Sequence, residues 1–395
     1  MIAALALTAF AMDLDGARVR ATERALAVEL AAAERDAARG ATTAATTDAL
    51  PAVSLFASAN TGAGLTAFGF ERPVAVQLGA GVQASWALIA PTTWAAATAS
   101  RRTARGRDAL LAWARVTARH DATSAYADAW SAARAVEAMD RSAADARQGA
   151  DAVAQHVAAG LLPPVDGARA EADARAAEAL AVESAGAVGI TCAALQALLA
   201  EPVTGVCALE PPVWSEPGTG GSHPALIAVE EALDAARSGR AGAVGGALPT
   251  LTLDATAATY AADGNVGPGW SAGAVARLPL DPGVGGDVHA ASARLRAATA
   301  LRANQARDLE RARVASEAQH AAALAGLTAR VAARSAAEQA WSLVDSRFAA
   351  GLLPLTDWLA ARRALQDARV AEVRAEAALG AALADLEAAR GVTAP

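Results

Sequence analysis

The sequence predicts a mainly α-helical protein with a small β part, built from two copies of one structural unit. The segment GLLPPVD at 160–166 returns as GLLPLTD at 351–357, an offset of 191 residues. A fixed offset between two matching segments indicates that a whole unit was duplicated. The repeat therefore predicts that the two halves of the chain have similar structures.

Composition and periodicity give the fold class. Alanine supplies most of the apolar residues, and aromatic residues make up only 4% of the chain. Alanine favours helix and buries little surface, so long helices packed through small side chains suit this composition. Two pairs of segments instead alternate apolar and polar residues, which is the period of β-strands.

Each copy contains the same elements in the same order. For residues 13–200 we expect a helix over 13–46, strands over 50–60 and 74–90, and helices over 92–158 and 163–199. For residues 222–391 we expect a helix over 224–240, strands over 248–261 and 269–280, and helices over 283–349 and 354–389. The stretch 201–221 is rich in proline and glycine and is predicted to be a linker between the copies.

Prolines and glycines mark the ends of the long helices. Pro91 and Pro282 stand where a helix can begin, and no proline follows until after Gly160 and Gly351. Glycine takes the left-handed conformation that ends many helices. Each long helix should therefore turn at a glycine tip into a second helix, which makes a helical hairpin.

The strand segments carry an apolar face and a polar face. Between 74 and 86 the even positions are apolar, among them Val74, Val76, Leu78, Val82 and Trp86. Apolar-out, polar-in strands are typical of a lipid-facing β-barrel, and four strands are too few to close one. Several chains must then contribute strands. An ordinary antiparallel sheet with one face covered by helices is the alternative.

Two tryptophans stand near the ends of the strand patterns. Trp86 and Trp270 are either anchors at the membrane interface or packing residues at the edge of the barrel. Phe56 and Val275 break the alternation of their strands.

Charge and cysteine content narrow the function. The net charge of −7 argues against a nucleic-acid partner. No uninterrupted apolar run reaches the ~18–20 residues of a spanning helix, so any membrane entry should use strands. Cys192 and Cys207 are either a disulfide or two ordinary thiols. We find no metal-ligand spacing, nucleophile–base pair or phosphate loop, and predict neither an enzyme nor a cofactor.

The first eleven residues are apolar and end in a small-x-small pattern, Ala9-Phe10-Ala11, which makes 1–12 a possible truncated signal segment. They lack the basic residues of a complete signal peptide. Two interpretations of this segment therefore remain: a truncated signal segment and an ordinary chain end.

Three motifs carry a resemblance to a known family. They are the run RFAAGL at 347–352 with Asp357 six residues after the glycine, HPAL at 223–226, and LPLD at 278–281. Together with the duplicated hairpins, these motifs resemble the TolC-type outer membrane factors of bacterial tripartite efflux pumps and type I secretion systems. The resemblance covers about residues 13–391. The first copy departs from the pattern, with His156 where the family often has arginine.

The resemblance implies a passive export duct. Three chains would close a twelve-stranded barrel in the outer membrane, and their helices would continue as a tube through the periplasm. The tips would contact a periplasmic adaptor and narrow to a gate, while an inner-membrane transporter supplies energy. The competing hypotheses are a soluble periplasmic coiled-coil adaptor or scaffold, and an enzyme with a helical insertion.

The resemblance also assigns residues to the gate and to the docking tip. Asp357 matches the first aperture aspartate of the family, Asp166 is its counterpart in the first copy, and the second aspartate falls on Ala360. An acid that complements the helix dipole is the alternative for both aspartates. The expected adaptor-docking tip comprises Gly160, Leu161, Leu162, Arg347, Gly351, Leu352 and Leu353. For the leucines, the alternative is burial against the neighbouring hairpin. For Arg347, the alternative is an ion pair with Asp345 or Asp357.

Overall fold

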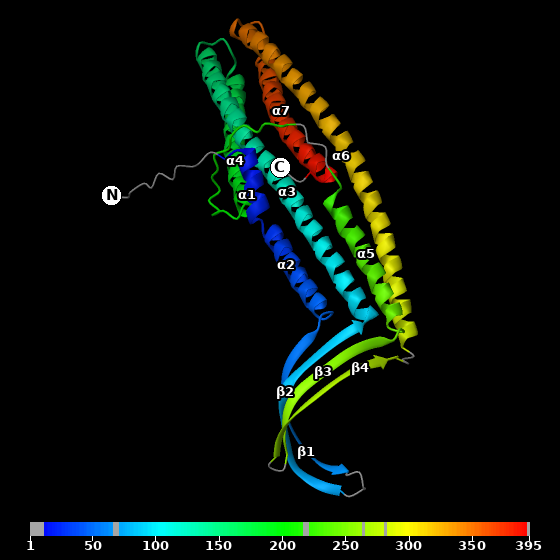
Figure 1. Ribbon diagram of the computed structural model, residues 1–395. Coiled ribbons are helices and arrows are strands. Elements are labelled where there is room, and N and C mark those ends of the chain that lie inside the picture. The colour runs from blue at the N-terminus through cyan, green and yellow to red at the C-terminus, as the bar shows by residue number, and fades with distance from the viewer. Residues whose placement is uncertain (1–11, 66–70, 216–220, 263–264, 280–282, 393–395) are drawn as a thin grey trace, which may run out of the picture. The chain divides into compact units, whose positions relative to one another are not determined.

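The computed structural model describes residues 12–65, 71–215, 221–262, 265–279 and 283–392. Within them the chain forms seven helices and four strands, which confirms the predicted fold class (Figure 1). The predicted signal segment lies outside the described residues, except for Met12. Two compact units divide the chain: one comprises 1–31, 111–224 and 307–395, and the other 32–110 and 225–306. Each unit takes segments from both sequence copies.

Long helices make up most of the chain. Their bounds are α1 Leu14–Arg24, α2 Leu26–Thr47, α3 Pro91–Ala158, α4 Pro164–Leu198, α5 Pro224–Gly245, α6 Val284–Ala349 and α7 Leu355–Arg390. No proline lies inside α3 or α6 after its first residue. Both helices can therefore keep their backbone hydrogen bonds over more than sixty residues.

The prediction of a single helix over 13–46 is wrong in one respect. The structure breaks it at Ala25, whose backbone is extended (φ −61°, ψ 134°). No glycine or proline stands at the break. The difference between the two helices lies in packing, because α1 buries Leu14 and Ala17 whereas α2 buries only Val28. Such contacts leave no local signal in the sequence.

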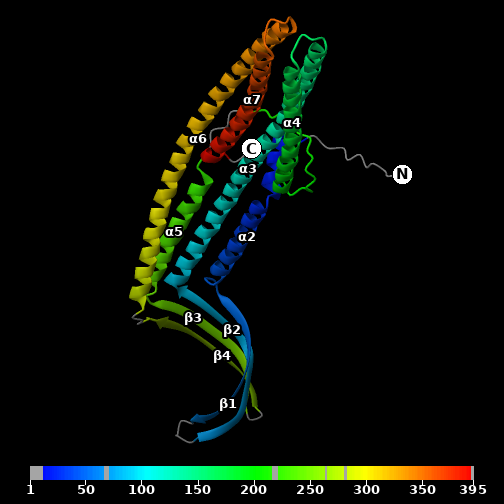
Figure 2. The same cartoon turned by 180° about the vertical axis from the view of Figure 1, so that it is seen from behind.

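The four strands form one antiparallel sheet in the order β1-β2-β3-β4, seen from both sides in Figures 1 and 2. Their bounds are β1 Ala52–Leu65, β2 Glu71–Ile89, β3 Thr250–Ala262 and β4 Asn265–Arg277. The hairpins extend further than predicted, since most of the expected turn stretches 61–73 and 262–268 is strand. A register shift between Asn60 and Gly62 accommodates the glycines of β1.

The strand register aligns the apolar side chains of the sheet. Residues paired directly across antiparallel strands lie on the same face. One row that crosses all four strands is apolar, and comprises Leu55, Val82, Ala257 and Trp270. The next row is polar, and comprises Ser54, Gln83, Thr256 and Ser271. The alternation of single strands thus becomes one apolar and one polar face of the whole sheet.

Phe56, which breaks the alternation, has a partner that makes room for it. It lies on the polar face directly opposite Gly81. A Cβ atom at Gly81 would stand 2.5 Å from the Cβ atom of Ala258. The glycine is therefore required by the close neighbouring strand, and it puts no side chain directly opposite Phe56.

The other unit is a helical bundle with buried charge. Arg18 of α1 donates to the Thr123 hydroxyl at 2.9 Å and to the Glu387 carboxylate at 3.3 Å. Glu387 also accepts from Arg119 at 3.2 Å. Burial lowers the pKa of Arg18, and the charge of Glu387 opposes that shift. These bonds join α1, α3 and α7, so truncating one partner would leave a buried charge unpaired.

One helix in the described part of the chain, α4, is by length and composition apolar enough to cross a membrane. The sequence predicts no such helix because Glu183 divides its apolar run. Length and composition are the only grounds for considering α4 here, and one such helix is weak evidence of a membrane span. The helix is tied to the segment that follows it through Cys192 and Gln196, and we count it with the bundle.

Candidate functional site at the two hairpin tips

The two tips share one backbone conformation. Gly160 and Gly351 have φ of 75° and 74°, a conformation that costs residues with a Cβ atom. The amide after each glycine bonds the carbonyl five residues earlier, at 2.9 Å in both tips. This bond satisfies a carbonyl that the helix end would otherwise leave unpaired. The glycines therefore end α3 and α6 in the way that the repeat predicts.

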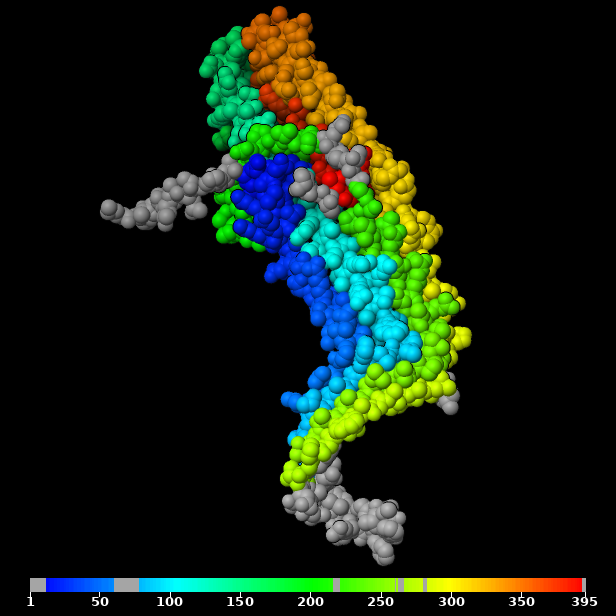
Figure 3. Space-filling model, in the orientation of Figure 1, coloured from blue at the N-terminus to red at the C-terminus, as the bar shows by residue number. Residues whose placement is uncertain are grey.

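The tip leucines divide into an exposed and a packed pair. Leu161 is 71% exposed and Leu352 is 72% exposed. Leu162 and Leu353 are only partly exposed, and Leu162 packs on the buried cluster beneath the tips. The prediction that all four leucines form one exposed patch is therefore too broad. One exposed leucine from each tip remains, and in Figure 3 the two tips lie against each other as neighbouring teal and orange atoms.

The two gate candidates differ in their charge environment. Asp166 lies in the first turn of α4 and pairs with Arg169 at 3.4 Å. Asp357 lies in the first turn of α7 and is exposed. Within the described ranges it has no ion-pair partner, and only the Thr356 hydroxyl lies near it, at 3.5 Å. The carboxylate of the second tip is thus exposed and has no compensating cation within the described ranges.

Arg347, at the end of α6, is exposed. The carboxylate of Asp345 accepts the indole N–H of Trp358 at 2.9 Å. Across the described residues, no ion pair joins Arg347 to Asp345 or to Asp357. The guanidinium therefore faces solvent beside the second tip.

The candidate membrane residues lie on the sheet, in the other unit. Leu78, Val82 and Trp86 are exposed along β2, and Trp270 of β4 is 83% exposed. Val74 and Val76 lie within β2, where the structure describes their backbone but not their side chains. Trp86 pairs with Leu253 in the register, four positions along β2 from the row that contains Trp270. The two tryptophans therefore occupy different levels of one apolar face.

A family model described as outer membrane efflux protein matches residues 17–201 and 221–392. The chain belongs to the outer membrane efflux protein family. Each matched stretch covers one sequence copy, and the gap between them falls in the predicted linker. Membership confirms the resemblance of the tip motifs, and no curated protein matches the chain.

Solved structures share the fold of this efflux protein. The outer membrane protein VceC from Vibrio cholerae has a TM-score of 0.85 at 20% identity, with 96% of each chain covered. A membrane protein from Pseudomonas aeruginosa has a TM-score of 0.85 at 18% identity, with 95% of this chain and 90% of that chain covered. The MtrE outer membrane channel of Neisseria gonorrhoeae, in its open state, has a TM-score of 0.83 at 19% identity, with 96% and 88% covered.

Family membership places the efflux protein in the outer membrane, with its helical part in the periplasm. It supports an export channel over a soluble adaptor or scaffold. The family is one of channels rather than enzymes. Among the described residues, no three His, Cys, Asp or Glu side chains gather as a metal site.

An aromatic cluster beneath the second tip of the efflux protein was not predicted from the sequence. Trp358 of α7 is only 4% exposed and lies 5.2 Å from Trp341 and 5.4 Å from Phe348 between ring centroids. A Cβ atom at Gly149 of α3 would stand 2.0 Å from its ring. Glycine at 149 is therefore required by the tryptophan, although the two are 209 residues apart.

A buried salt bridge joins the two hairpins of the efflux protein. Asp173 of α4 accepts from Arg362 of α7, and from Arg363 at 2.8 Å. Arg362 also donates to the carbonyl of Ser142 on α3 at 3.2 Å. Burial lowers the pKa of Arg362, and the neighbouring charge of Arg363 lowers it further. Any separation of α4 from α7 at this level would have to break these bonds.

His120 bridges two helices of the bundle through its imidazole ring. Its Nδ1 lies 2.9 Å from Asp121 of α3, and its Nε2 lies 2.9 Å from Asp385 of α7. Burial lowers the pKa of His120, but the bonds to the two carboxylates outweigh that and raise it. The protonated ring can donate to both carboxylates, whereas the neutral ring can donate to only one.

Proposed function

We propose that three copies of this chain form an export duct whose twelve-stranded barrel spans the outer membrane and whose helices continue as a periplasmic tube. The observation that carries the proposal is the single apolar face formed by all four strands. That face is not a property of one hairpin, because its central row takes one residue from each strand. Leu78, Val82, Trp86 and Trp270 would face lipid, together with Val74 and Val76.

The unpaired edges of the sheet support assembly of several copies. In one chain, β1 and β4 are the edge strands. Unpaired backbone groups are costly in hydrocarbon, and closed barrels avoid them. Pairing β1 of one copy with β4 of the next would satisfy both edges at once.

The assembly is tested by the mass of the detergent-purified protein and by its heat-sensitive migration on denaturing gels. We expect a trimer that fractionates with outer membranes and dissociates on heating. A monodisperse monomer that stays in solution without detergent would contradict the duct and favour a soluble scaffold. Charged substitution of Val82, in the central apolar row, should reduce the trimer, while Gln83→Glu on the polar face serves as the matched control.

We further propose that Asp357 forms the gate, as a three-fold ring of carboxylates at the inner end of the tube. Three like charges at a constriction repel one another, attract cations and respond to pH. Asp357 is free of ion pairs among the described residues, whereas Asp166 is paired with Arg169. With Ala360 in place of a second aspartate, the gate would consist of one ring only.

Conductance in planar bilayers tests the gate. We expect Asp357→Asn to change the closed-state conductance severalfold and to weaken its dependence on pH and divalent cations. Asp166→Asn is the matched control and should change it less, because the Asp166 carboxylate is largely buried against Arg169 whereas that of Asp357 is exposed. Identical currents from Asp357→Asn and the unaltered channel at every pH would reject the ring.

We propose that the tips bind a periplasmic adaptor protein, and that this adaptor connects the channel to an inner-membrane transporter. The exposed Leu161 and Leu352 offer apolar contact, and Arg347 offers a charge beside the second tip. Leu352→Asp should reduce binding of a purified adaptor hairpin at least tenfold. Leu324→Asp, at an exposed leucine within α6, is the matched control and should leave binding unchanged. Equal losses would contradict docking at the tip.

A further inference from the structure

The segment after α4 is fixed to the bundle along its length. We name residues 201–215 the strap. The sequence predicts this stretch to be a linker, and it does join the two copies. In the structure, however, it is bonded to α4, to the N-terminal Met12 and to α3, all within one compact unit.

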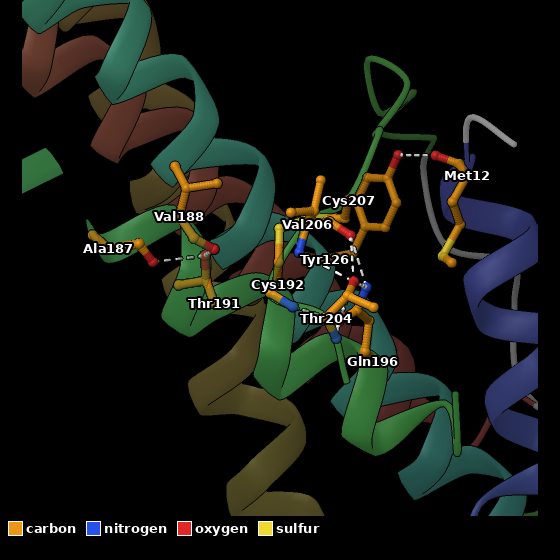
Figure 4. The surroundings of a disulfide bond; sticks show 11 residues. Met12, Tyr126, Ala187, Val188, Thr191, Cys192, Gln196, Thr204, Val206 and Cys207 are labelled. Carbon is orange, nitrogen blue, oxygen red and sulfur yellow. Dashed lines mark hydrogen bonds between the residues drawn. A yellow bond between two sulfur atoms is a disulfide. The ribbon is translucent and has the colours of Figure 1, made fainter. Parts of the chain in front are cut away.

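The first attachment is to α4. Cys207 of the strap forms a disulfide with Cys192, which is fully buried. One turn further along α4, the Gln196 amide accepts from the Thr204 and Gly205 amides at 2.8 and 3.1 Å. It also donates to the Val206 carbonyl at 2.7 Å. Figure 4 shows the disulfide and this amide side by side on one face of α4.

The second attachment is to the start of the described chain. The Met12 amide donates to the Ala208 carbonyl at 2.9 Å, and the Glu210 amide donates to the Met12 carbonyl at 3.0 Å. The hydroxyl of Tyr126, a fully buried residue of α3, lies 2.8 Å from the Met12 carbonyl and 2.7 Å from the Glu210 carbonyl, and donates its one proton to either of them. Figure 4 shows its contact with Met12. The strap residues that follow Cys207 therefore hold the chain just before α1.

The third attachment is to α7. A Cβ atom at Gly380 would stand 2.4 Å from the ring of Trp214. The tryptophan thus lies directly on the backbone of α7. Met12, α3, α4 and α7 are all held through one short segment.

We propose that the Cys192–Cys207 disulfide is the fastening of the strap, and that a thiol-oxidising partner protein of the periplasm must install it. Apart from an ion pair between Arg20 of α1 and Glu201 at the start of the strap, and the contact of Trp214, the remaining attachments are neutral hydrogen bonds, each worth about 1 kcal/mol net. Many strap residues are exposed, so little apolar burial opposes release. Disulfides form and persist in the periplasm, where the helical part of this family resides.

The chemistry of installation balances as thiol–disulfide exchange. A thiolate of the chain attacks the disulfide of an oxidised dithiol protein, which forms a mixed disulfide and releases one thiolate of the partner. The second chain thiolate attacks the mixed disulfide, and the partner leaves with both sulfurs reduced. Two electrons pass to the partner, and the two protons of the chain thiols are released. Because Cys192 is fully buried beneath the strap, this exchange must precede its closure.

Hydrogen exchange of the full-length protein in detergent tests the fastening, before and after reduction. We expect exchange in 203–210 and around Met12 to become on the order of 100-fold faster on reduction, which is the loop-closure effect of a 15-residue separation. Peptides of the two tips should not change and serve as the internal control. Equal protection in both states would overturn the proposal, since the hydrogen bonds alone would then hold the strap.

Two variants separate the disulfide from the hydrogen bonds. The double variant Cys192→Ser/Cys207→Ser should match the reduced protein, whereas Gln196→Leu should retain most protection because its disulfide remains. If the double variant fails to fold, reduction of the folded wild type still gives the comparison. The opposite ranking of the two variants would assign the fastening to Gln196.

The need for an oxidising partner is tested in cells. Thiols of the full-length chain are alkylated at lysis, in cells with and without their periplasmic dithiol oxidase, and counted by mass. We expect no free thiols with the oxidase and predominantly reduced chain without it. A fully oxidised chain in both strains would overturn the requirement for a partner, and a fully reduced chain in both would overturn the fastening itself.

Discussion

The two hairpin tips have the same backbone and different side chains. Both turn at a left-handed glycine with the same closing hydrogen bond. At the position seven residues after that glycine, the first tip has Gly167 and the second has Trp358. At the position nine residues after it, the first has Arg169 and the second has Ala360. The duplication kept the turn, while packing and charge diverged.

This divergence suits the second tip, rather than the first, to the gate proposed above. The first tip compensates Asp166 with its own arginine. The second leaves Asp357 uncompensated within the described residues, and anchors its helix with a buried tryptophan instead. A gate needs a charge that can respond and a helix that returns to one position. The second tip has both of these features.

The largest effect should come from the tryptophan that the first tip lacks. We expect Trp358→Ala to lower the free energy of unfolding by about 3–5 kcal/mol, because it empties a buried site. Gly149→Ala should destabilise in the same direction through the clash with that ring. Denaturant unfolding of the detergent-purified protein measures both.

The counterpart change in the first tip is the control. A Cβ atom at Gly167 would lie 3.5 Å from the Val157 side chain, an ordinary contact. Gly167→Ala should therefore be nearly neutral. If Gly167→Ala lowered the free energy of unfolding as much as Trp358→Ala, the difference in packing between the tips would not contribute to stability.

The buried salt bridge should give the next largest effect. Asp173→Ala leaves Arg362 buried without its carboxylate, and we expect a loss of about 3 kcal/mol in unfolding free energy. Glu171, the first-copy counterpart of Arg362, instead pairs with Arg147 and Arg175 at the surface. Glu171→Ala should barely change stability. Equal losses in the same unfolding assay would show that burial does not distinguish these charges.

The shared glycines should give equal and smaller effects. Nothing lies within 4 Å of a Cβ atom built at Gly160 or Gly351, so the cost of alanine there is the backbone conformation alone. We expect Gly160→Ala and Gly351→Ala each to lower stability by about 1 kcal/mol. Thermal unfolding of the two variants makes the comparison. A difference well beyond that value would mean that the two turns are not equivalent.

The smallest effect should be a pH dependence confined to the first copy. The folded pKa of His120 is raised, so its stabilisation is complete below the unfolded value of about 6.5 and is lost as pH rises through the folded value. The melting temperature of His120→Asn should therefore approach that of wild type at alkaline pH. Arg311, its second-copy counterpart, stays charged, and Arg311→Asn should show no such trend. A His120→Asn deficit that grew with pH would contradict the assignment.

Local features made much of the fold predictable. Proline and glycine mark the turns at both tips, and the alternation along β2 indicates which of its residues share a face. The break at Ala25 was not predictable, because neither neighbour of that alanine disfavours helix. The extra length of β1 was missed because glycines near 62 read as a turn, although a register shift lets them continue the strand.

Candidate site residues could be proposed from the sequence only where the chain repeats. The tip glycines, the tip leucines and Asp357 were proposed because one copy points to the other and because the motif resembles a family. Trp358 against Gly149 and Asp173 against Arg362 were missed, since each pair joins helices about two hundred residues apart in sequence. A sequence shows that such residues are present, but it does not show which of them meet.

The strap contains Pro202, Pro211 and Pro212 among its fifteen positions. Proline has no amide hydrogen, so these positions require no acceptor where the segment lies along the helices. Proline also narrows the ensemble of the open chain, which reduces the entropy lost on closing. Of the three prolines, only Pro202 lies between Cys192 and Cys207, so it is the one that restricts the segment closed by the disulfide. Pro211 and Pro212 restrict the part of the strap that runs on past Cys207 to Trp214.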